Sequence, residues 1–225
     1  MKLISVEQAR AVWLFPLTDL NPRGTAIEKD GLTEIRNRYE FAVAPGPAEI
    51  VAARETQQPL KYLQGSFTPK KRKEAITVDL LLYRDGIIAD TRSSTTDSDE
   101  FIGDLLNWAT KELGLLPHEE IVRSKGAVSS LYVTSAKPMS LLNPKLEAFS
   151  KILTENVSGQ NSGAKLEFAS FGFWPDQNLI NPPAPFRFER AAGALFSENR
   201  YYSLAPINTE KHIDLLNELE KLLAS

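Results

Sequence analysis

The chain has 225 residues, of which 42% are hydrophobic and 24% charged, and 26 basic against 29 acidic residues give a net charge of −3. This composition is that of a globular protein and excludes a disordered chain. The absence of cysteine excludes disulfides, thiolate metal sites and cysteine nucleophiles. The acidic balance argues against a dedicated double-stranded DNA binder, because phosphate neutralisation supplies most of the affinity of such proteins.

The first twenty residues show no targeting segment. Glu7 and Arg10 stand where a signal peptide needs an apolar run. The spacing of Ser5 and Gln8 resembles a capping box and predicts a short helical start, and residues 11–15 are expected to form a strand. No stretch approaches the ~20 apolar residues that cross a membrane. We therefore predict a soluble cytoplasmic protein with no membrane partner, which the lack of cysteine fits.

The next segments alternate apolar and polar residues, which is typical of strands with one buried face. The strands are expected over residues 36–44, 59–67, 75–83 and 87–92. Asp85 followed by Gly86 predicts a tight hairpin turn between the last two, because this pair supports positive φ angles. Residues 48–55 form a short element after the Pro45-Gly46-Pro47 break.

A helix is expected after the hairpin. Asp97, with Glu100 three residues on, predicts its start, since carboxylates suit the positive end of the helix dipole. Gly114 marks its end. The apolar residues of its buried stripe are Phe101, Ile102, Leu105, Trp108, Ala109 and Leu113.

The second half continues with strands and two helices. The strands are expected over residues 128–135, 165–174, 186–190 and 200–204. Asn143-Pro144 opens a helix whose buried stripe is Leu146, Phe149, Ile152 and Leu153. Residues 209–223 form the last helix. Consecutive strands with few helices between them predict an α+β fold, an antiparallel or mixed sheet with about three amphipathic helices packed on it.

The whole chain, residues 1–225, is predicted to be one domain. The sequence Asp104-Leu105-Leu106-Asn107 recurs as Asp214-Leu215-Leu216-Asn217. Each copy lies in a predicted helix that follows a strand. This indicates two related β-rich halves, residues 1–117 and 118–225.

Aromatic residues near the end of the chain are the main candidate for a binding surface. They flank a stiff loop over 175–185 that contains four prolines, and such a loop can present a preorganised apolar patch to a partner. The alternative is that the rings close the core. The candidate partner-binding residues are Phe171, Phe173, Trp174, Phe186, Tyr201 and Tyr202. We predict a non-catalytic interaction or assembly module, self-associating as a homo-oligomer or binding another protein, with no cofactor.

A basic run supplies the second hypothesis, nucleic-acid binding. A basic hairpin loop can lie along a phosphate backbone, and the candidate contacts are Lys61, Lys70, Lys71, Arg72 and Lys73. The alternative is a solvated loop tip that blunts the edge of the sheet.

Carboxylates supply the third hypothesis, a metal-dependent nuclease or hydrolase. Asp79 and Asp90 lie on two paired strands and are expected to face the same side, as ligands of a catalytic metal must. The two histidines suggest no catalytic pair, because His118 is expected in an exposed loop and His212 in the last helix. A Gly-x-Ser-x-Gly nucleophile motif is absent.

Overall fold

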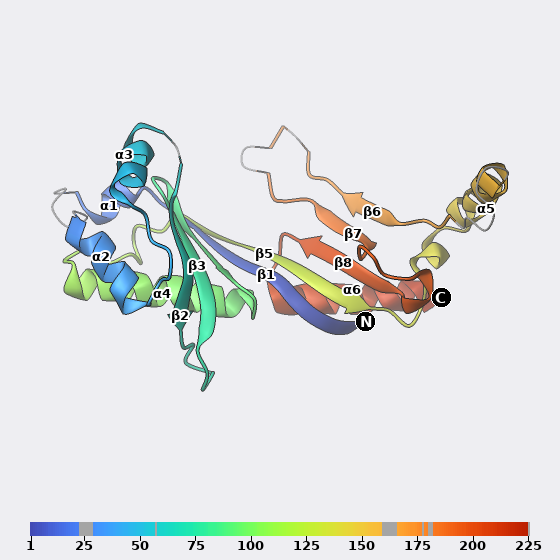
Figure 1. Ribbon diagram of the computed structural model, residues 1–225, viewed down its shortest axis with the longest axis horizontal. Helices are drawn as coiled ribbons and strands as arrows, with labels where there is room; N and C mark the ends of the chain where they lie inside the picture. The colour runs from blue at the N-terminus through green and yellow to red at the C-terminus, as the bar shows by residue number, and fades with distance from the viewer. Residues whose placement is uncertain (23–28, 57, 159–165, 177, 180–181, 225) are drawn as a thin grey trace. The chain divides into compact units, whose positions relative to one another are not determined.

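The computed structural model describes residues 1–22, 29–56, 58–158, 166–176, 178–179 and 182–224. Its strands form one eight-stranded sheet of order β2-β3-β4-β1-β5-β8-β7-β6, in which the hairpin pairs β2–β3, β3–β4, β6–β7 and β7–β8 are antiparallel. Helices come between groups of strands along the chain (Figure 1). The structure confirms the predicted α+β class.

The chain divides into two compact units, which are described separately. The β2–β4 unit consists of Glu7–Ser129 and Ile207–Thr209, and the β6–β8 unit of Met1–Val6, Ser130–Pro206 and Glu210–Ser225. Strands β1 and β5 have residues in both units. The units therefore divide the chain at other positions than the sequence halves 1–117 and 118–225.

The elements follow one another in a regular order. The first group is β1 (Lys2–Leu14), α1 (Leu17–Leu20), α2 (Lys29–Arg38), α3 (Pro47–Glu55), β2 (Leu60–Phe67), β3 (Ile76–Tyr83), β4 (Gly86–Thr91), α4 (Thr95–Glu112) and β5 (Ser124–Thr134). The second group is η1 (Met139–Leu142), α5 (Pro144–Ser158), β6 (Ser170–Phe173), β7 (Phe186–Arg190), η2 (Phe196–Glu198), β8 (Arg200–Ala205) and α6 (Thr209–Ala224), where η denotes a 3₁₀ turn.

In the β2–β4 unit, α4 packs on one face of the sheet. Its fully buried Phe101 is the centre of an aromatic cluster, with ring centroids 4.9 Å from Tyr39 and 5.4 Å from Phe67. The edge-to-face geometry of both pairs is the favoured one. The strands contribute alternate residues to this core, as their period requires: Ala9, Ala11 and Trp13 from β1, Val78 and Leu80 from β3, and Ile87 and Ala89 from β4.

The N-cap of helix α4 lies three residues before Asp97, which the sequence predicts as the cap. Ser94 is its N-cap, and the Ser94 side chain accepts a hydrogen bond from the Asp97 N–H at 3.1 Å. Asp97 is therefore in the first turn, where its carboxylate pairs with Arg72 at 2.8 Å. Ser94 with Asp97 three positions on has the spacing of a capping box, so the start of the helix is marked by Ser94.

Two predicted elements of the β2–β4 unit are wrong. Strand β1 is continuous from Lys2 to Leu14, with no helical start at Ser5, and it pairs with β4 from Ala9 onward. No strand forms over 36–44: residues 36–38 end helix α2, residues 39–40 are a turn, and Val43 makes only an isolated bridge to Leu63. The buried apolar residues of this stretch do not lie on a strand: Tyr39 is in the turn after the helix, and Phe41 follows that turn.

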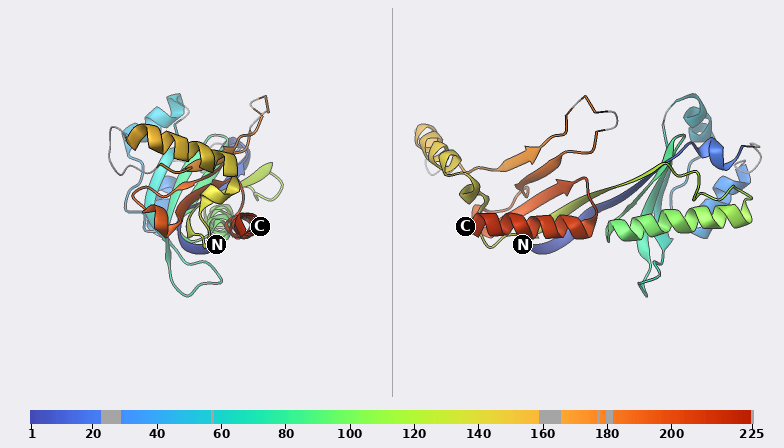
Figure 2. Two further views of the ribbon diagram at one scale, coloured as in Figure 1. Left: turned by 90° about the vertical axis from the view of Figure 1, so that its right-hand side faces the viewer. Right: turned by 180° about the vertical axis from the view of Figure 1, so that it is seen from behind.

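In the β6–β8 unit, α6 covers one face of the strands (Figure 2). Leu216 and Leu223 are buried there, and Phe188 of β7 stacks on Tyr201 of β8 with ring centroids 4.8 Å apart. Met139 of η1 completes this core. The second core is smaller than that of the β2–β4 unit, and several apolar residues of the β6–β8 unit remain outside it.

Helix α5 forms where Asn143-Pro144 predicts it, but its apolar stripe is not buried as expected. Leu146, Phe149, Ile152 and Leu153 are all exposed, Phe149 by 59% and Ile152 by 56%. Helical periodicity shows that a helix has an apolar face and does not show what covers it. Helix α5 contacts η1, and the Thr154 hydroxyl of α5 accepts a hydrogen bond from the Leu166 N–H at 3.0 Å.

Candidate functional site

Strand β6 is the outermost strand of the sheet, next to β7. The N–H of Arg190 donates to the carbonyl oxygen of Ala169 at 2.8 Å, just before the strand. Since hydrogen-bonded and non-hydrogen-bonded pairs alternate in an antiparallel ladder, Ser170 and Gly172 turn their N–H and C=O groups away from β7. These outward groups are free to pair with another strand, and none of the described strands does so.

The side chains of β6 and β7 form an aromatic row on one face. Phe171 lies opposite Phe188, and Phe173 lies opposite Phe186, with ring centroids 5.5 and 6.0 Å apart. Phe171 and Phe173 are 5.9 Å apart along their own strand. The row leads from the buried Phe188 to Phe173, which is 68% exposed. The core of this unit therefore extends to the surface at the edge of the sheet.

Trp174 follows β6 directly and is 65% exposed. The Arg187 guanidinium lies 5.2 Å from the centroid of its ring, a cation–π distance that fixes the ring without burying it. We call Phe171, Phe173, Trp174 and Phe186, together with the outer backbone of β6, the β6 edge surface. Four of the six residues proposed from the sequence belong to it.

The other two, Tyr201 and Tyr202, do not belong to the β6 edge surface. Tyr201 is fully buried, and its hydroxyl accepts a hydrogen bond from the Met139 N–H at 2.9 Å. Burial raises the pKa of Tyr201. Tyr202 points to the opposite face, as the next residue of a strand must, and packs on Tyr132 with ring centroids 5.4 Å apart. Tyr201 is a core residue and not a partner contact.

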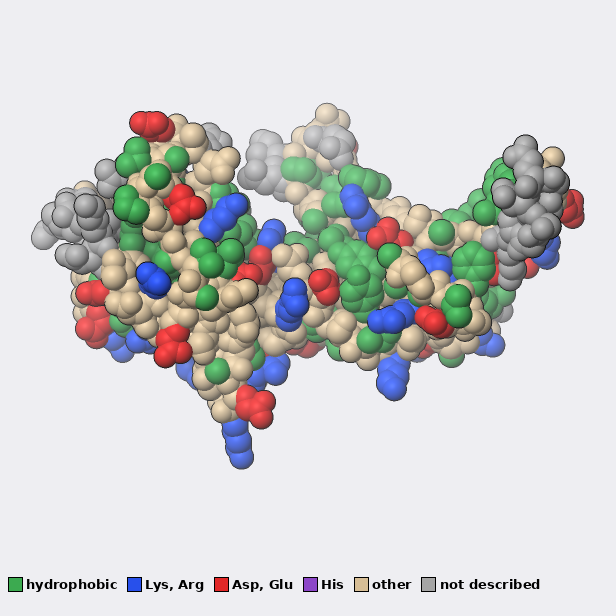
Figure 3. Space-filling view, in the orientation of Figure 1, with side chains coloured by type: hydrophobic (Ala, Val, Ile, Leu, Met, Phe, Trp, Pro, Cys, Tyr) green, Lys and Arg blue, Asp and Glu red, His purple; other side chains and the backbone are tan. Residues whose placement is uncertain are grey.

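The exposed stripe of α5 is a second apolar surface of the same unit, and sequence reasoning missed it. Hydrophobic side chains show on the face of the β6–β8 unit that Figure 3 presents. An exposed apolar patch with large side chains marks an interaction site more often than a single exposed residue does. The α5 stripe and the β6 edge surface both carry Phe side chains that are more than half exposed, Phe149 and Phe173.

The basic residues do not converge. Phe67 pairs with Ile76, so the basic run lies in the loop that closes the β2–β3 hairpin, whereas Lys61 pairs with Leu81 near the other end. Lys61 lies six positions before Phe67 on the strand, a distance of roughly 20 Å. In Figure 1 this loop projects at the end of β2 and β3. Lys70, Lys71 and Lys73 are exposed, but Arg72 is paired with Asp97.

Asp79 and Asp90 are direct partners in the β3–β4 ladder and so face the same side of the sheet. Both carboxylates are engaged. Asp79 accepts a hydrogen bond from the Gln64 N–H at 2.7 Å, and Asp90 accepts hydrogen bonds from Nε and Nη2 of Arg10 at 2.8 and 2.7 Å. The hydrogen bond to Asp90 raises the pKa of Arg10. Within the described ranges, no three His, Asp or Glu side chains come together as metal ligands.

The two histidines are buried. His118 is 8% exposed, against the expectation of an exposed loop, and its ring lies 5.5 Å from that of Trp13. His212 contacts the Ser203 hydroxyl through Nε2 at 2.8 Å, and both residues have no exposed surface. Ser203 also donates to the Arg187 carbonyl oxygen at 3.1 Å. No substrate reaches a fully buried Ser–His pair, so this pair supports the fold.

No helix in the part of the chain that the structure describes has both the length and the apolar character needed to cross a lipid bilayer. Comparison with known proteins gives no family assignment: no protein-family model matches the chain, and no curated protein matches it.

Proposed function

We propose that the protein is a non-catalytic assembly module that self-associates through the β6 edge surface. The observation that carries the proposal is the exposure of two large apolar side chains at the outermost strand, Phe173 by 68% and Trp174 by 65%. Burying a side chain of this size contributes about 1.5–3 kcal/mol. Two copies of the surface bury four such rings.

The backbone of β6 supports the same proposal. Its sequence, Ser-Phe-Gly-Phe, has no charged residue and no proline, whereas edge strands that must stay unpaired are protected by such residues. Ser170 and Gly172 offer outward N–H and C=O groups. In an isologous dimer each copy offers the same groups to the other, so antiparallel pairing of two β6 strands satisfies both sets.

The apolar stripe of α5 adds area to this unit's interface in the proposed assembly. Stable protein interfaces bury about 1,200–2,000 Å² in total, more than a four-residue strand supplies. Phe149 and Ile152 are the residues of α5 that we expect to lose solvent exposure. We place this assembly in the cytoplasm as part of the proposal. A chain without cysteine is compatible with that reducing compartment.

The test is light-scattering chromatography and sedimentation velocity over a range of protein concentrations. Ser170→Pro removes one outward N–H group and leaves the ladder to β7 intact, because proline is tolerated where an edge N–H faces solvent. Phe173→Lys removes apolar area and adds a charge. We expect a dimer or larger closed oligomer for the wild type and a monomer for both variants.

The matched control is Val51→Lys, a substitution of another exposed apolar residue, on α3, which is 55% exposed. It should leave the mass unchanged. A wild-type chain that is monomeric at every concentration contradicts the proposal. An absorbance spectrum that shows copurifying nucleic acid, removed when Lys70, Lys71 and Lys73 are replaced by Gln, favours the nucleic-acid hypothesis instead.

A further inference from the structure

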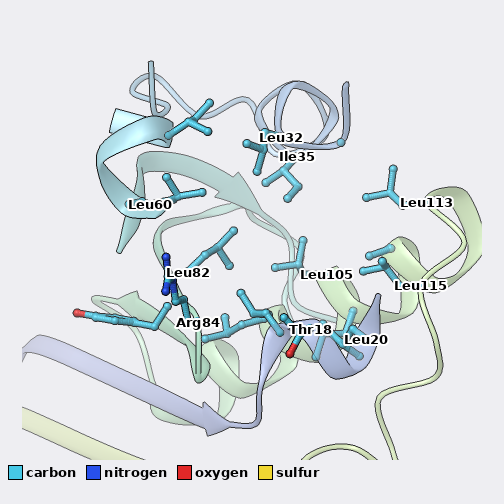
Figure 4. A pocket seen from close by; sticks show the side chains of 18 of the residues that line it. Thr18, Leu20, Leu32, Ile35, Leu60, Leu82, Arg84, Leu105, Leu113 and Leu115 are labelled. Carbon is cyan, nitrogen blue, oxygen red and sulfur yellow. The ribbon is translucent and has the colours of Figure 1, made fainter. Parts of the chain in front are cut away.

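The β2–β4 unit contains an apolar cavity of 530 Å³. It lies between the strands β2 to β4 and the four helices of the unit (Figure 4). Among its walls are Leu32 and Ile35 of α2, Leu60 of β2, Leu82 of β3 and Leu105 of α4. Small-molecule sites in proteins have volumes of about 300–1,000 Å³ and are lined mostly by apolar groups, so this cavity has the size of a ligand site.

The side chains that line the cavity indicate which class of ligand it can bind. Apart from Thr18, Gln58, Tyr83 and Arg84, the lining side chains are those of Leu, Ile and Ala. Tyr83 is the one aromatic residue among the described lining residues, so the wall offers methyl groups and little ring surface for stacking. A flexible alkyl chain fits such a wall better than a flat aromatic molecule, because it adapts its shape to close contacts with many methyl groups.

Arg84 supplies the charge. It is the only charged residue among the described residues that line the cavity, and its side chain is exposed. Figure 4 shows its guanidinium nitrogens on the same side of the cavity as Leu60 and Leu82. Within the described ranges, no acidic side chain and no carbonyl oxygen is paired with this guanidinium, whereas Arg10, Arg38, Arg72, Arg123 and Arg190 all have acidic partners.

We propose that this cavity binds a single-chain aliphatic amphiphile with an anionic head group. The alkyl chain lies among the Leu and Ile side chains, and the head group pairs with Arg84 beside the turn between β3 and β4. The site lies in the β2–β4 unit and is independent of the assembly proposed for the β6 edge surface. Free fatty acids and single-chain lipid phosphates share this chemistry.

The experiment is isothermal titration calorimetry of the full chain with octanoate, decanoate, octyl phosphate and 1-octanol. Each additional buried methylene should tighten binding by about fourfold, so we expect decanoate to bind more than tenfold more tightly than octanoate. Tighter binding of octanoate than octyl phosphate assigns a carboxylate head group, and the reverse assigns a phosphate; both support the proposal. Failure of all four probes to bind, or affinity independent of chain length, overturns it.

Two variants locate the bound molecule. Arg84→Gln should weaken octanoate binding by about two- to fivefold, the range of an exposed ion pair, and leave 1-octanol binding unchanged. Arg84→Lys should restore most of the loss. Lys71→Gln is the matched control, because Lys71 is an exposed cation of the same unit that does not line the cavity, and it should have no effect. An equal loss in Lys71→Gln overturns the role of Arg84.

Ala53→Phe tests the cavity itself. Ala53 lies on α3, lines the cavity and is half-buried, so a ring at this position fills space that the alkyl chain would occupy. We expect decanoate binding to fall by at least tenfold, with the thermal unfolding midpoint unchanged or raised. Undiminished decanoate binding by this folded variant places the ligand elsewhere and overturns the proposal.

Discussion

Thr95 and Thr209, the first residues of α4 and α6, cap each other's helices. The Thr95 N–H donates to the Thr209 hydroxyl oxygen at 3.1 Å, and the Thr209 N–H donates to the Thr95 hydroxyl oxygen at 3.0 Å. Both residues are buried. Each helix therefore satisfies one of its unpaired N-terminal N–H groups with a side chain that is 114 residues away in the sequence.

Replacing Thr209 by Val should destabilise the protein by about 1–2 kcal/mol, because the change leaves the buried Thr95 N–H without an acceptor. Urea denaturation followed by circular dichroism measures the loss. Thr77→Val is the control, since Thr77 is exposed on β3 and should change stability by less than about 0.5 kcal/mol. If the two hydroxyls act as one unit, the Thr95→Val/Thr209→Val double variant loses less than the sum of the single losses.

Two glycines of the β2–β4 unit should respond to alanine with opposite signs. A Cβ atom at Gly65 would lie 2.6 Å from Cδ1 of Phe41, whose ring is buried, so Gly65→Ala should cost about 1–3 kcal/mol. Gly103 is inside α4, and its Cβ would meet only the Trp13 ring at 3.9 Å. Gly103→Ala should therefore stabilise the protein by about 0.5–1 kcal/mol. Equal effects at the two positions would contradict this assignment.

Neighbouring tyrosines on β8 make a matched pair. Tyr201→Phe removes the hydroxyl that accepts from the Met139 N–H and should cost about 1–3 kcal/mol, because that N–H is buried and loses its acceptor. Tyr202→Phe removes a hydroxyl on the other face of the strand and should be within about 0.5 kcal/mol of wild type. Thermal and urea unfolding distinguish them. Neither change should alter the oligomer, since both rings lie outside the β6 edge surface.

Glu220 of α6 makes stability depend on pH in the acidic range. Burial raises the pKa of its carboxyl group, but hydrogen bonds from the Met1 ammonium, the Ala136 N–H and the Ser135 hydroxyl outweigh burial and hold the pKa below its ordinary value of 4.5. A lowered folded-state pKa adds stability above pH 4.5, and this stability is lost as the pH falls through the folded-state value.

We therefore expect Glu220→Gln to be less stable than wild type at pH 7, by up to about 1 kcal/mol because the group is partly exposed. The difference should shrink and disappear as the pH falls from 4.5 through the folded-state pKa of Glu220. Glu218→Gln, on the same helix and 66% exposed, is the control and should show little change at either pH. The free energy of unfolding of both variants and the wild type, measured at pH 7, 5 and 3, tests this pH dependence.

Most strands could be predicted from the sequence because their period is local. Strand β3 alternates from Ile76 to Tyr83, and Asp85-Gly86 marks the hairpin turn in the sequence itself. Helix α2 could not be predicted in the same way. It ends with Glu40 at a φ of +52° and a hydrogen bond from the Phe41 N–H to the Arg36 carbonyl oxygen. This termination usually carries glycine, so a glutamate gave no signal that a helix ended there.

The candidate sites show the same limit. The row of Phe171, Phe173 and Phe186 follows from strand period and pairing, which the sequence indicates. The burial of Tyr201 depends on Met139, which is 62 residues away. Whether Phe149 is exposed depends on whether another element packs on α5, and the sequence of α5 does not indicate this. The cavity beside Arg84 has no local pattern at all, because its wall is assembled from seven separate elements.

Trp174 gives the protein a natural optical reporter. Trp13 is 3% exposed and donates its indole N–H to Asp99, and Trp108 is half-buried against the core, whereas Trp174 is 65% exposed. Emission at the red edge of the tryptophan spectrum, and quenching by acrylamide, therefore come chiefly from Trp174. Occupation of the β6 edge surface by any partner would shift that emission to the blue without a label on the chain.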